Sequence, residues 1–214
     1  KPLGSALTAL GIISGVGAVI AMVTIGNGTP AKVTADMAKL GTNLLFVRPG
    51  QFGPGRASQE AKPFNIRDIE ALRAELSGVR AVAPRTRASA TIVYGTENRN
   101  STVMGTDNAF FTTQDWNLQS GRQFLDSEVR GGRTVCIIGN TVRRELFGPY
   151  ESLGRRLRVN KVSCEVIGIL EPKGESSFGT DQDDVVIMPL RAFQRRIAAN
   201  TDISDLLVSA EHGV

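Results

Sequence analysis

The sequence is poor in the residue types that build most catalytic sites. It contains one histidine, His212, and two cysteines, Cys136 and Cys164, and none of them falls in a C-x-x-C pair or in a zinc-ligand spacing. A catalytic triad would have only His212 as its base, which argues against a hydrolase. We therefore expect no metal, no cofactor and no enzymatic activity in this chain.

Nucleotide and nucleic-acid binding are disfavoured as well. No G-x-x-x-x-G-K-[ST] segment occurs, so the chain does not bind nucleotide in the manner of a P-loop ATPase. The formal net charge of +4 comes from basic residues spread along the chain, and aromatic residues make up only 6% of the sequence. A nucleic-acid surface would need a basic stripe with stacking aromatics, so we expect no nucleic-acid partner.

Charged residues are absent from Pro2 through Ala31. Residues 6–25 are apolar or small almost throughout, and about 20 such residues in a helix span a bilayer core of about 30 Å. A secretory signal peptide and a buried core helix are the alternatives, but the first has a shorter apolar core and the second rarely runs so far without a charge. Helical spacing continues to Gly41, so we predict a transmembrane and stalk helix over residues 1–41.

Small residues recur within this predicted helix. Gly11 and Gly15 form a G-x-x-x-G spacing, which lets a second helix approach closely. The sequence around Gly15 also looks like the start of a dinucleotide-binding fingerprint, but it opens no strand–helix–strand unit. We therefore expect Gly11 and Gly15 to be helix-packing positions in a bundle of membrane helices.

Beyond the predicted stalk, two strand–helix–strand patterns flank a middle segment. The first comprises residues 42–47, 66–77 and 79–83, with Pro84 ending its last strand, and the second comprises residues 185–188, 190–199 and 204–210. Helices that pack on a sheet in this order predict an α+β fold with a split βαβ-type subdomain and an inserted small α/β subdomain.

These patterns divide the chain into four predicted segments. They are the transmembrane and stalk helix, the first part of the split subdomain, the inserted subdomain and the second part of the split subdomain. Their boundaries are residues 1–41, 42–105, 106–183 and 184–214.

The two cysteines fall in separate predicted strands, residues 134–138 and 163–167. In an oxidising compartment Cys136 and Cys164 could form a disulfide. The sequence alone does not bring their Cα atoms within the roughly 6 Å that a disulfide requires, so bonded and free thiols both stay open.

An acidic, glycine-rich segment that follows residues 121–124 and ends at Gly132 is predicted to be a loop. A glycine-containing, charged segment from Lys173 to Asp184 is predicted to be a second loop. Its carboxylates Asp181, Asp183 and Asp184 have a spacing that suits Ca²⁺, but the glycine and bidentate glutamate of an EF-hand loop are missing. We interpret them as a solvated acidic loop. Phe178 in the same loop is a candidate contact residue.

A set of short segments, taken together, resembles one known family. They occur in the family's order over most of the chain: residues 7–13, 39–43, 121–124, 138–140, 145–148, 153–154 and 166–170. In this set the sequence is similar to MacB-type ABC transporter permeases. Nothing in it matches the ATPase or the later membrane helices of those proteins, so the sequence looks like a fragment of one.

The resemblance implies a fold, a location and partners. It implies an extracytoplasmic domain between the first two membrane helices of a bacterial inner-membrane permease, with a porter-like part split around an inserted sabre-like part. It further implies a homodimer, a cytoplasmic ATPase domain or subunit, and contact with a periplasmic adaptor and an outer-membrane channel. The expected function is to couple ATP hydrolysis to periplasmic movement during efflux. A ligand-sensing or lipoprotein-handling module of a related membrane protein is the alternative.

Overall fold

A computed structural model describes residues 44–50, 63–176 and 179–210. The predicted transmembrane and stalk helix, residues 1–41, lies outside the described residues, and so do Gly11 and Gly15. None of the helices in the described ranges is long and apolar enough to cross a membrane.

A nine-stranded mixed sheet dominates the described part of the chain, with short helices between the strands. The strands are β1 (Leu44–Val47), β2 (Val79–Tyr94), β3 (Glu97–Thr106), β4 (Leu118–Gly121), β5 (Val135–Ile138), β6 (Arg156–Val159), β7 (Val162–Leu170), β8 (Val185–Pro189) and β9 (Asp205–Ala210). The helices are α2 (Ile66–Glu75), α3 (Ala109–Thr113), α4 (Asp126–Gly131), α5 (Asn140–Phe147), α6 (Leu190–Phe193) and the π-helical turn η1 (Gln194–Ala198).

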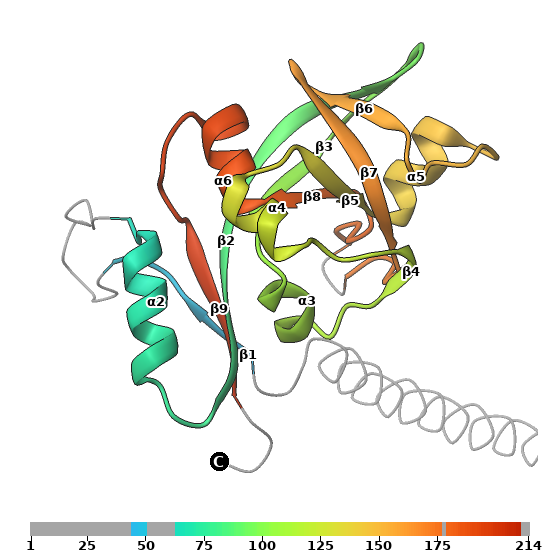
Figure 1. The fold of residues 1–214 in the computed structure, drawn as a ribbon. Coiled ribbons are helices and arrows are strands. Elements are labelled where there is room, and N and C mark those ends of the chain that lie inside the picture. Colours follow the sequence, from blue (N-terminus) through green and yellow to red (C-terminus); the bar gives the residue numbers. More distant parts are fainter. Residues whose placement is uncertain (1–43, 51–62, 177–178, 211–214) are drawn as a thin grey trace, which may run out of the picture. The chain divides into compact units, whose positions relative to one another are not determined.

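One long strand, β2, connects two regions of this sheet. The strand order is β1-β9-β2-β3-β8-β5-β7-β4, and β6 pairs with β2 and β7. The first half of β2 pairs with β9, and its second half pairs with β3 as a hairpin. Figure 1 shows β2 as a continuous ribbon that runs from the region of α2, β1 and β9 into the region of β6 and β7.

The smaller region is a split βαβ arrangement. β9 lies antiparallel between β1 and β2, so β1 and β2 run parallel and α2 is the connection between them. The side chain of Asn65 caps α2 by accepting from the backbone N–H groups of Arg67 and Asp68, and the carboxylate of Asp68 accepts from the backbone N–H of Asn65. This capping box satisfies N–H groups that the first turn would otherwise leave unpaired.

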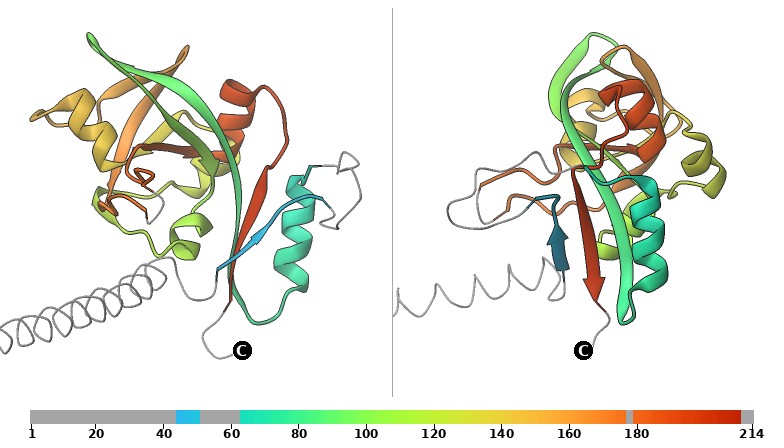
Figure 2. Two further views of the ribbon diagram at one scale, coloured as in Figure 1. Left: turned by 180° about the vertical axis from the view of Figure 1, so that it is seen from behind. Right: turned by 90° about the vertical axis from the view of Figure 1, so that its left-hand side faces the viewer.

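Strand β9 is covered on both faces. Leu206 and Val208 share a cluster with Ile69 of α2, whereas Leu207 between them belongs to a second cluster that contains Phe110 of α3. Alternate side chains of a strand point to opposite faces, so α2 and α3 cover the two sides of β9. This explains why β9 is an apolar run rather than an alternating one. The two flanking helices are visible in Figure 1 and from behind in Figure 2.

The larger region is built around β8, which pairs parallel with β3 and antiparallel with β5. Its core includes Trp116 and Phe147, which are 7% and 2% exposed. The indole N–H of Trp116 also donates to the backbone oxygen of Glu171 at 2.7 Å. A buried indole therefore has the partner that it needs.

The hydrogen-bonded sheet does not follow the predicted segment boundaries. β3 ends at Thr106 and β8 begins at Val185, so these strands lie on either side of the predicted inserted segment 106–183. They nevertheless pair with each other, and β8 pairs with β5 of the inserted segment. Strand β2 changes its partner from β9 to β3 between Arg85 and Thr86, so the two regions of the sheet meet there. The functional division of the chain into subdomains stays a prediction.

Two local predictions were wrong. Pro84 does not end the strand, because β2 continues through it to Tyr94. Pro84 lies where β2 changes from β9 to β3 as its partner, a place where a missing backbone donor costs little, and its carbonyl accepts from the hydroxyl of Thr106 at 2.6 Å. The segment predicted as an acidic glycine-rich loop before Gly132 contains the helix α4.

A buried ion pair lies at this change of partner. Arg85 of β2 and Asp205 of β9 are directly opposite each other, and two N–H···O bonds of 2.7 and 2.9 Å join their side chains. The side chains are only 8% and 6% exposed. Thr86 and Ser204 add a hydroxyl–hydroxyl contact of 3.2 Å beside them. These contacts fix the register of β2 and β9 at the end of their pairing.

Candidate functional site

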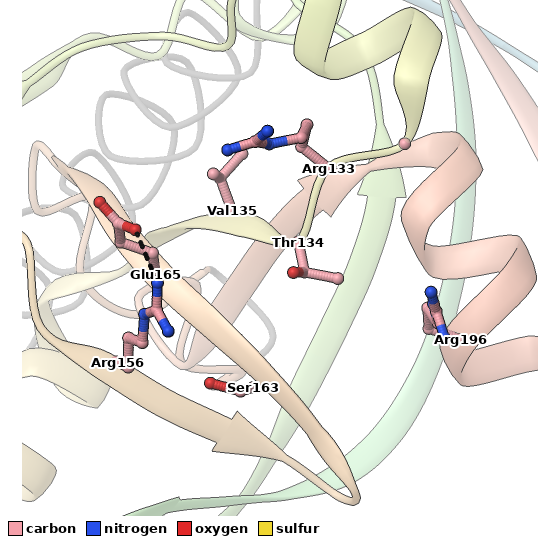
Figure 3. A pocket seen from close by; sticks show the side chains of 8 residues that line it. Arg133, Thr134, Val135, Arg156, Ser163, Glu165 and Arg196 are labelled. Atoms are coloured by element: carbon pink, nitrogen blue, oxygen red, sulfur yellow. Dashed lines mark ion pairs between the residues drawn. The ribbon is translucent and has the colours of Figure 1, made fainter.

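A polar groove opens on the larger region beside the start of β5. We call it the arginine groove; its volume is about 370 Å³, and it is lined by Gly132, Arg133, Thr134, Val135, Arg156, Ser163, Glu165 and Arg196. These residues come from the α4–β5 connection, from the β6–β7 hairpin and from η1. Figure 3 shows the side chains of Arg133, Arg156 and Arg196 placed around the central Thr134 and Ser163.

The position of Arg133 depends on the end of α4. Gly132 follows the helix with φ of +66°, the left-handed conformation that favours glycine, and its N–H donates to the carbonyl of Glu128. A Cβ at Gly132 would lie 3.2 Å from the Cβ of Arg191, so a larger residue would also crowd α6. The glycine therefore ends α4 close to α6 and turns the chain into the groove at Arg133.

The other end of α4 is held by Glu128. Its carboxylate accepts from two nitrogens of Arg122, each at 2.8 Å, and from the backbone N–H of Leu125 at 2.8 Å. The hydrogen bond from Arg122 is the main cause that lowers the pKa of Glu128. Glu128 therefore stays ionised at neutral pH and stabilises the first turn of the helix that leads to the groove.

On the opposite side of the groove, Arg156 and Glu165 face each other across β6 and β7. They are directly opposite in the antiparallel ladder, and their nearest charged atoms are 3.8 Å apart. Their side chains are 73% and 45% exposed. Figure 3 shows this pair at the groove wall. An exposed pair at this distance is a weak contact, so Arg156 keeps donors for a further partner.

Arg133 and Arg196 complete the positive side of the groove. Both are exposed, and neither has a carboxylate oxygen within 4.0 Å among the residues that the structure describes. Three guanidinium groups thus line the groove together with one carboxylate, that of Glu165. Guanidinium groups donate paired N–H bonds to planar oxyanions, and the hydroxyls of Thr134 and Ser163 add two further donors. The groove therefore has the chemistry of an anion-binding site.

The two cysteines lie in the core next to the groove. Cys136 of β5 and Cys164 of β7 are fully buried and hold free thiols, so the disulfide that the sequence left open is not formed in this structure. Burial is the main cause that raises the pKa of Cys164, and its neighbour Cys136 adds to it. The two residues act here as small core side chains, and the thiol of Cys136 points to the carbonyl of Glu165 at 3.5 Å.

The acidic loop is not a solvated one, which corrects the interpretation of its carboxylates. Asp183 is buried and accepts from the backbone N–H groups of Lys173 and Gly174, at 2.8 and 3.0 Å. Asp181 accepts from the hydroxyl of Thr141 at 2.8 Å. Each carboxylate is therefore occupied by a structural contact. No group of three or more His, Cys, Asp and Glu side chains that could hold a metal ion occurs within the described ranges.

The third carboxylate, that of Asp184, pairs with an arginine. It forms a bidentate pair with Arg99 of β3, with both N–H···O distances at 3.0 Å. The loop is thus anchored at its end to the central strands. Phe178, the predicted contact residue in this loop, lies outside the described residues.

The sequence did not indicate the arginine groove. Its charged residues belong to four separate elements or connections, and their spacing in the sequence does not indicate that they line one groove. The signals in the sequence are local: Asp126 and Glu128 followed by Gly132 fit the acidic start and glycine end of a short helix. Such a helix places Arg133 at the start of a strand, but it does not place it beside Arg156 and Arg196.

Comparison with known proteins identifies the family. The model of the MacB-like periplasmic core domain matches residues 5–214. The chain is 35% identical over 208 residues to the macrolide export ATP-binding/permease protein MacB of Azoarcus sp. (strain BH72), which covers 97% of this chain and 31% of that protein. It is 38% identical over 211 residues to the protein of the same name from Rhodospirillum rubrum, covering 97% of this chain and 32% of that protein.

Solved structures share the fold. The crystal structure of the periplasmic region of MacB from Actinobacillus actinomycetemcomitans matches with a TM-score of 0.70 and 21% identity, over 86% of this chain and 81% of that one. The extracellular domain of the ABC-type transporter YknZ from Gram-positive bacteria matches with a TM-score of 0.64 and 21% identity, over 80% of this chain and 85% of that one.

These matches confirm the resemblance and the mixed α/β, sheet-dominated fold. The chain spans about a third of the length of the curated relatives named above, at 31% and 32%. It belongs to the family of MacB-like periplasmic core domains.

Proposed function

We propose that this chain is the extracytoplasmic part of a MacB-like exporter permease in a bacterial inner membrane. In this proposal it has no catalytic role of its own. It transmits movement driven by a cytoplasmic ATPase domain or subunit to the periplasm and docks an adaptor that leads to an outer-membrane channel. The intact permease works as a homodimer. The observation that carries the proposal is the match to the family model over residues 5–214, together with relatives named for macrolide export.

The continuous strand β2 supports a role in transmitting movement. β2 pairs with β9 in one region and with β3 in the other, so a displacement of one region is carried to the other without a hinge between two strands. The buried Arg85–Asp205 pair holds β2 to β9 where the pairing changes. A stiff connection of this kind suits a domain that relays a displacement.

The proposal is tested in the intact parent protein by inserting three glycines after Gly28, within the predicted stalk. We expect the insertion to abolish the macrolide resistance that the wild-type gene restores to a deletion strain, while basal ATP hydrolysis in membranes persists. The matched control carries the same insertion after Ser58, in a stretch that the sequence marks as rich in glycine and proline. It should keep both activities.

Two results would contradict the proposal. Full resistance with glycines after Gly28 would show that no rigid link from the membrane is needed. A wild-type gene that restores no macrolide resistance, in a strain where it is expressed and its ATPase is active, would exclude macrolide export.

A further inference from the structure

The arginine groove contains an open strand edge, which is a second feature besides its charge. β7 pairs with β5 from Glu165 onward, where the N–H of Glu165 donates to the oxygen of Thr134 at 3.2 Å. The residues that precede Thr134 do not continue this pairing with β7. The chain makes a tight turn there, in which the N–H of Val135 donates to the oxygen of Arg133 at 3.0 Å. The ladder between β5 and β7 therefore ends at Thr134, while β7 itself extends back to Val162.

The backbone of Ser163 faces this open position. Val166 bonds toward the β6 side, because its N–H donates to the oxygen of Arg155 and its oxygen accepts from the N–H of Gly154. Backbone groups of a strand point alternately to its two sides, so Cys164 also faces β6 while Glu165 and Ser163 face the β5 side. Glu165 has Thr134 as its partner there. Ser163, one step further out, has no backbone partner on that side among the described residues.

The open edge and the charges lie in one groove. Ser163 and Thr134 line the groove, and Figure 3 shows Arg133, Arg156 and Arg196 around them. An unpaired strand edge offers an N–H donor and a C=O acceptor, which is the pattern that an extended peptide satisfies. Guanidinium groups beside the edge would then receive the acidic side chains of that peptide.

We propose that the arginine groove binds an extended acidic peptide segment of a partner protein, which adds to the open edge of β7 at Ser163 and places its carboxylates against Arg133, Arg156 and Arg196. The proposal stands on the groove alone and does not depend on the transport role of the parent protein.

Other anions fit the groove less well. An inorganic phosphate accepts hydrogen bonds but donates few, so it leaves the carbonyl of Ser163 without a donor. A volume of about 370 Å³ also exceeds what a single small anion fills. Nucleic acid is disfavoured because none of the residues that line the groove is aromatic, whereas sites for single-stranded nucleic acid combine basic residues with aromatic side chains.

The test measures binding to the full chain in a neutral detergent by isothermal titration calorimetry. The probe is a blocked hexapeptide of alternating glutamate and threonine, and its counterpart has glutamine in place of glutamate. The double variant Arg133→Gln, Arg196→Gln removes the two groove arginines that have no carboxylate partner among the described residues. It should bind the acidic peptide about tenfold more weakly or worse, because each substitution removes a charge-assisted hydrogen bond to the peptide. The glutamine peptide should bind the wild type as weakly as the acidic peptide binds this variant.

A charge-matched variant separates a site from general attraction. Arg48→Gln with Arg67→Gln removes two exposed arginines that do not line the groove, and it should leave the affinity within about twofold at physiological salt, where distant surface charges are screened. Circular dichroism melting of both double variants checks that each is folded. An acidic peptide with an N-methyl group on every backbone amide, which has no N–H donor on either edge, should bind at least about tenfold more weakly.

Three results would overturn the proposal. The first is an equal loss of affinity in the two double variants. The second is unchanged binding of the N-methylated peptide, which would exclude addition to the edge of β7. The third is saturable binding of inorganic phosphate that is lost in the Arg133→Gln, Arg196→Gln variant while the peptide does not bind, which would identify a small-anion site.

Discussion

Two arginine–carboxylate pairs of this domain each join directly opposite residues of neighbouring strands, but one pair is buried and the other is exposed. Arg85 and Asp205 are directly opposite across β2 and β9, and Arg156 and Glu165 are directly opposite across β6 and β7. The first pair is bidentate at 2.7 and 2.9 Å and almost completely buried. The second is 3.8 Å apart, with side chains 73% and 45% exposed.

The difference shows that burial decides what such a pair does. In the buried pair each charge depends on the other, because neither can regain water if its partner is lost. In the exposed pair water competes for both charges, and the contact adds little to stability. We therefore assign Arg85 and Asp205 to holding two strands together, and Arg156 to a surface that is available to a ligand.

The largest expected effect comes from breaking the buried pair. Asp205→Asn leaves Arg85 buried without its partner, and Arg85→Gln leaves the buried Asp205 with only the half-exposed Arg87, 3.8 Å away. Each substitution should lower the free energy of unfolding by about 3 to 5 kcal/mol. Urea unfolding followed by circular dichroism measures the loss. Arg67→Gln on the exposed face of α2 is the control and should stay near the wild type. A loss below about 1 kcal/mol at Arg85 would mean that water reaches the pair.

A smaller loss is expected at Gly139, which follows β5 and lies against the backbone of Asp183 in the acidic loop. A Cβ there would overlap the backbone of Asp183, closer than atoms can approach. Gly139→Ala should therefore displace that backbone and cost about 1 to 3 kcal/mol in urea unfolding. Gly131→Ala is the matched control, since no atom lies within 4 Å of the added Cβ. If both substitutions are neutral, the backbone of Asp183 moves away from Gly139 at no cost.

The Arg122–Glu128 pair should show an intermediate effect with a clear pH dependence. Glu128→Gln removes the charge that accepts from Arg122 and should cost about 1 to 3 kcal/mol at pH 7. The pKa of Glu128 is lower in the folded protein than its ordinary value, so its stabilising contribution is full above the unfolded pKa and is lost as the pH falls through the folded pKa.

The stability difference between wild type and Glu128→Gln should therefore begin to shrink below about pH 4.5 and vanish at lower pH. Urea unfolding at a series of pH values measures it, with the exposed Glu70→Gln as the control for a carboxylate without this pair. A difference that grows on acidification would show that the pKa of Glu128 is raised by folding instead.

The smallest effect is expected for the exposed pair. Arg156→Gln should change the free energy of unfolding by less than about 0.5 kcal/mol, because the contact is long and solvated. Urea unfolding of this variant beside Arg85→Gln makes the contrast between the two pairs directly visible. A loss comparable to that of Arg85→Gln would place Arg156 among the residues that stabilise the fold.

Local signals in the sequence were sufficient to predict several elements. The helix predicted over residues 66–77 corresponds to α2, and the strands predicted over residues 42–47, 79–83 and 204–210 overlap with β1, β2 and β9. Fold class and family followed as well, because short segments such as residues 121–124 and 138–140 keep their order along the chain. These features depend on residues that are close in sequence or on a pattern that runs along it.

Features that depend on residues far apart in the sequence could not be predicted from it. Arg85 and Asp205 are 120 positions apart, and only the placement of β9 beside β2 brings them together. The same holds for the groove, which Arg133 and Arg196 both line because Gly132 ends α4 against α6. Pro84 misled the prediction, because its local preference was overridden by pairing on both sides of it.

A double-mutant cycle on both pairs tests the central comparison most directly. Urea unfolding of Arg85→Gln, Asp205→Asn and their combination gives one coupling energy, and Arg156→Gln, Glu165→Gln and their combination gives the other. We predict a coupling of about 2 kcal/mol or more for the buried pair and below about 0.5 kcal/mol for the exposed pair. Equal coupling energies, or a larger one for Arg156 and Glu165, would contradict the assignment of one pair to the fold and the other to the binding surface.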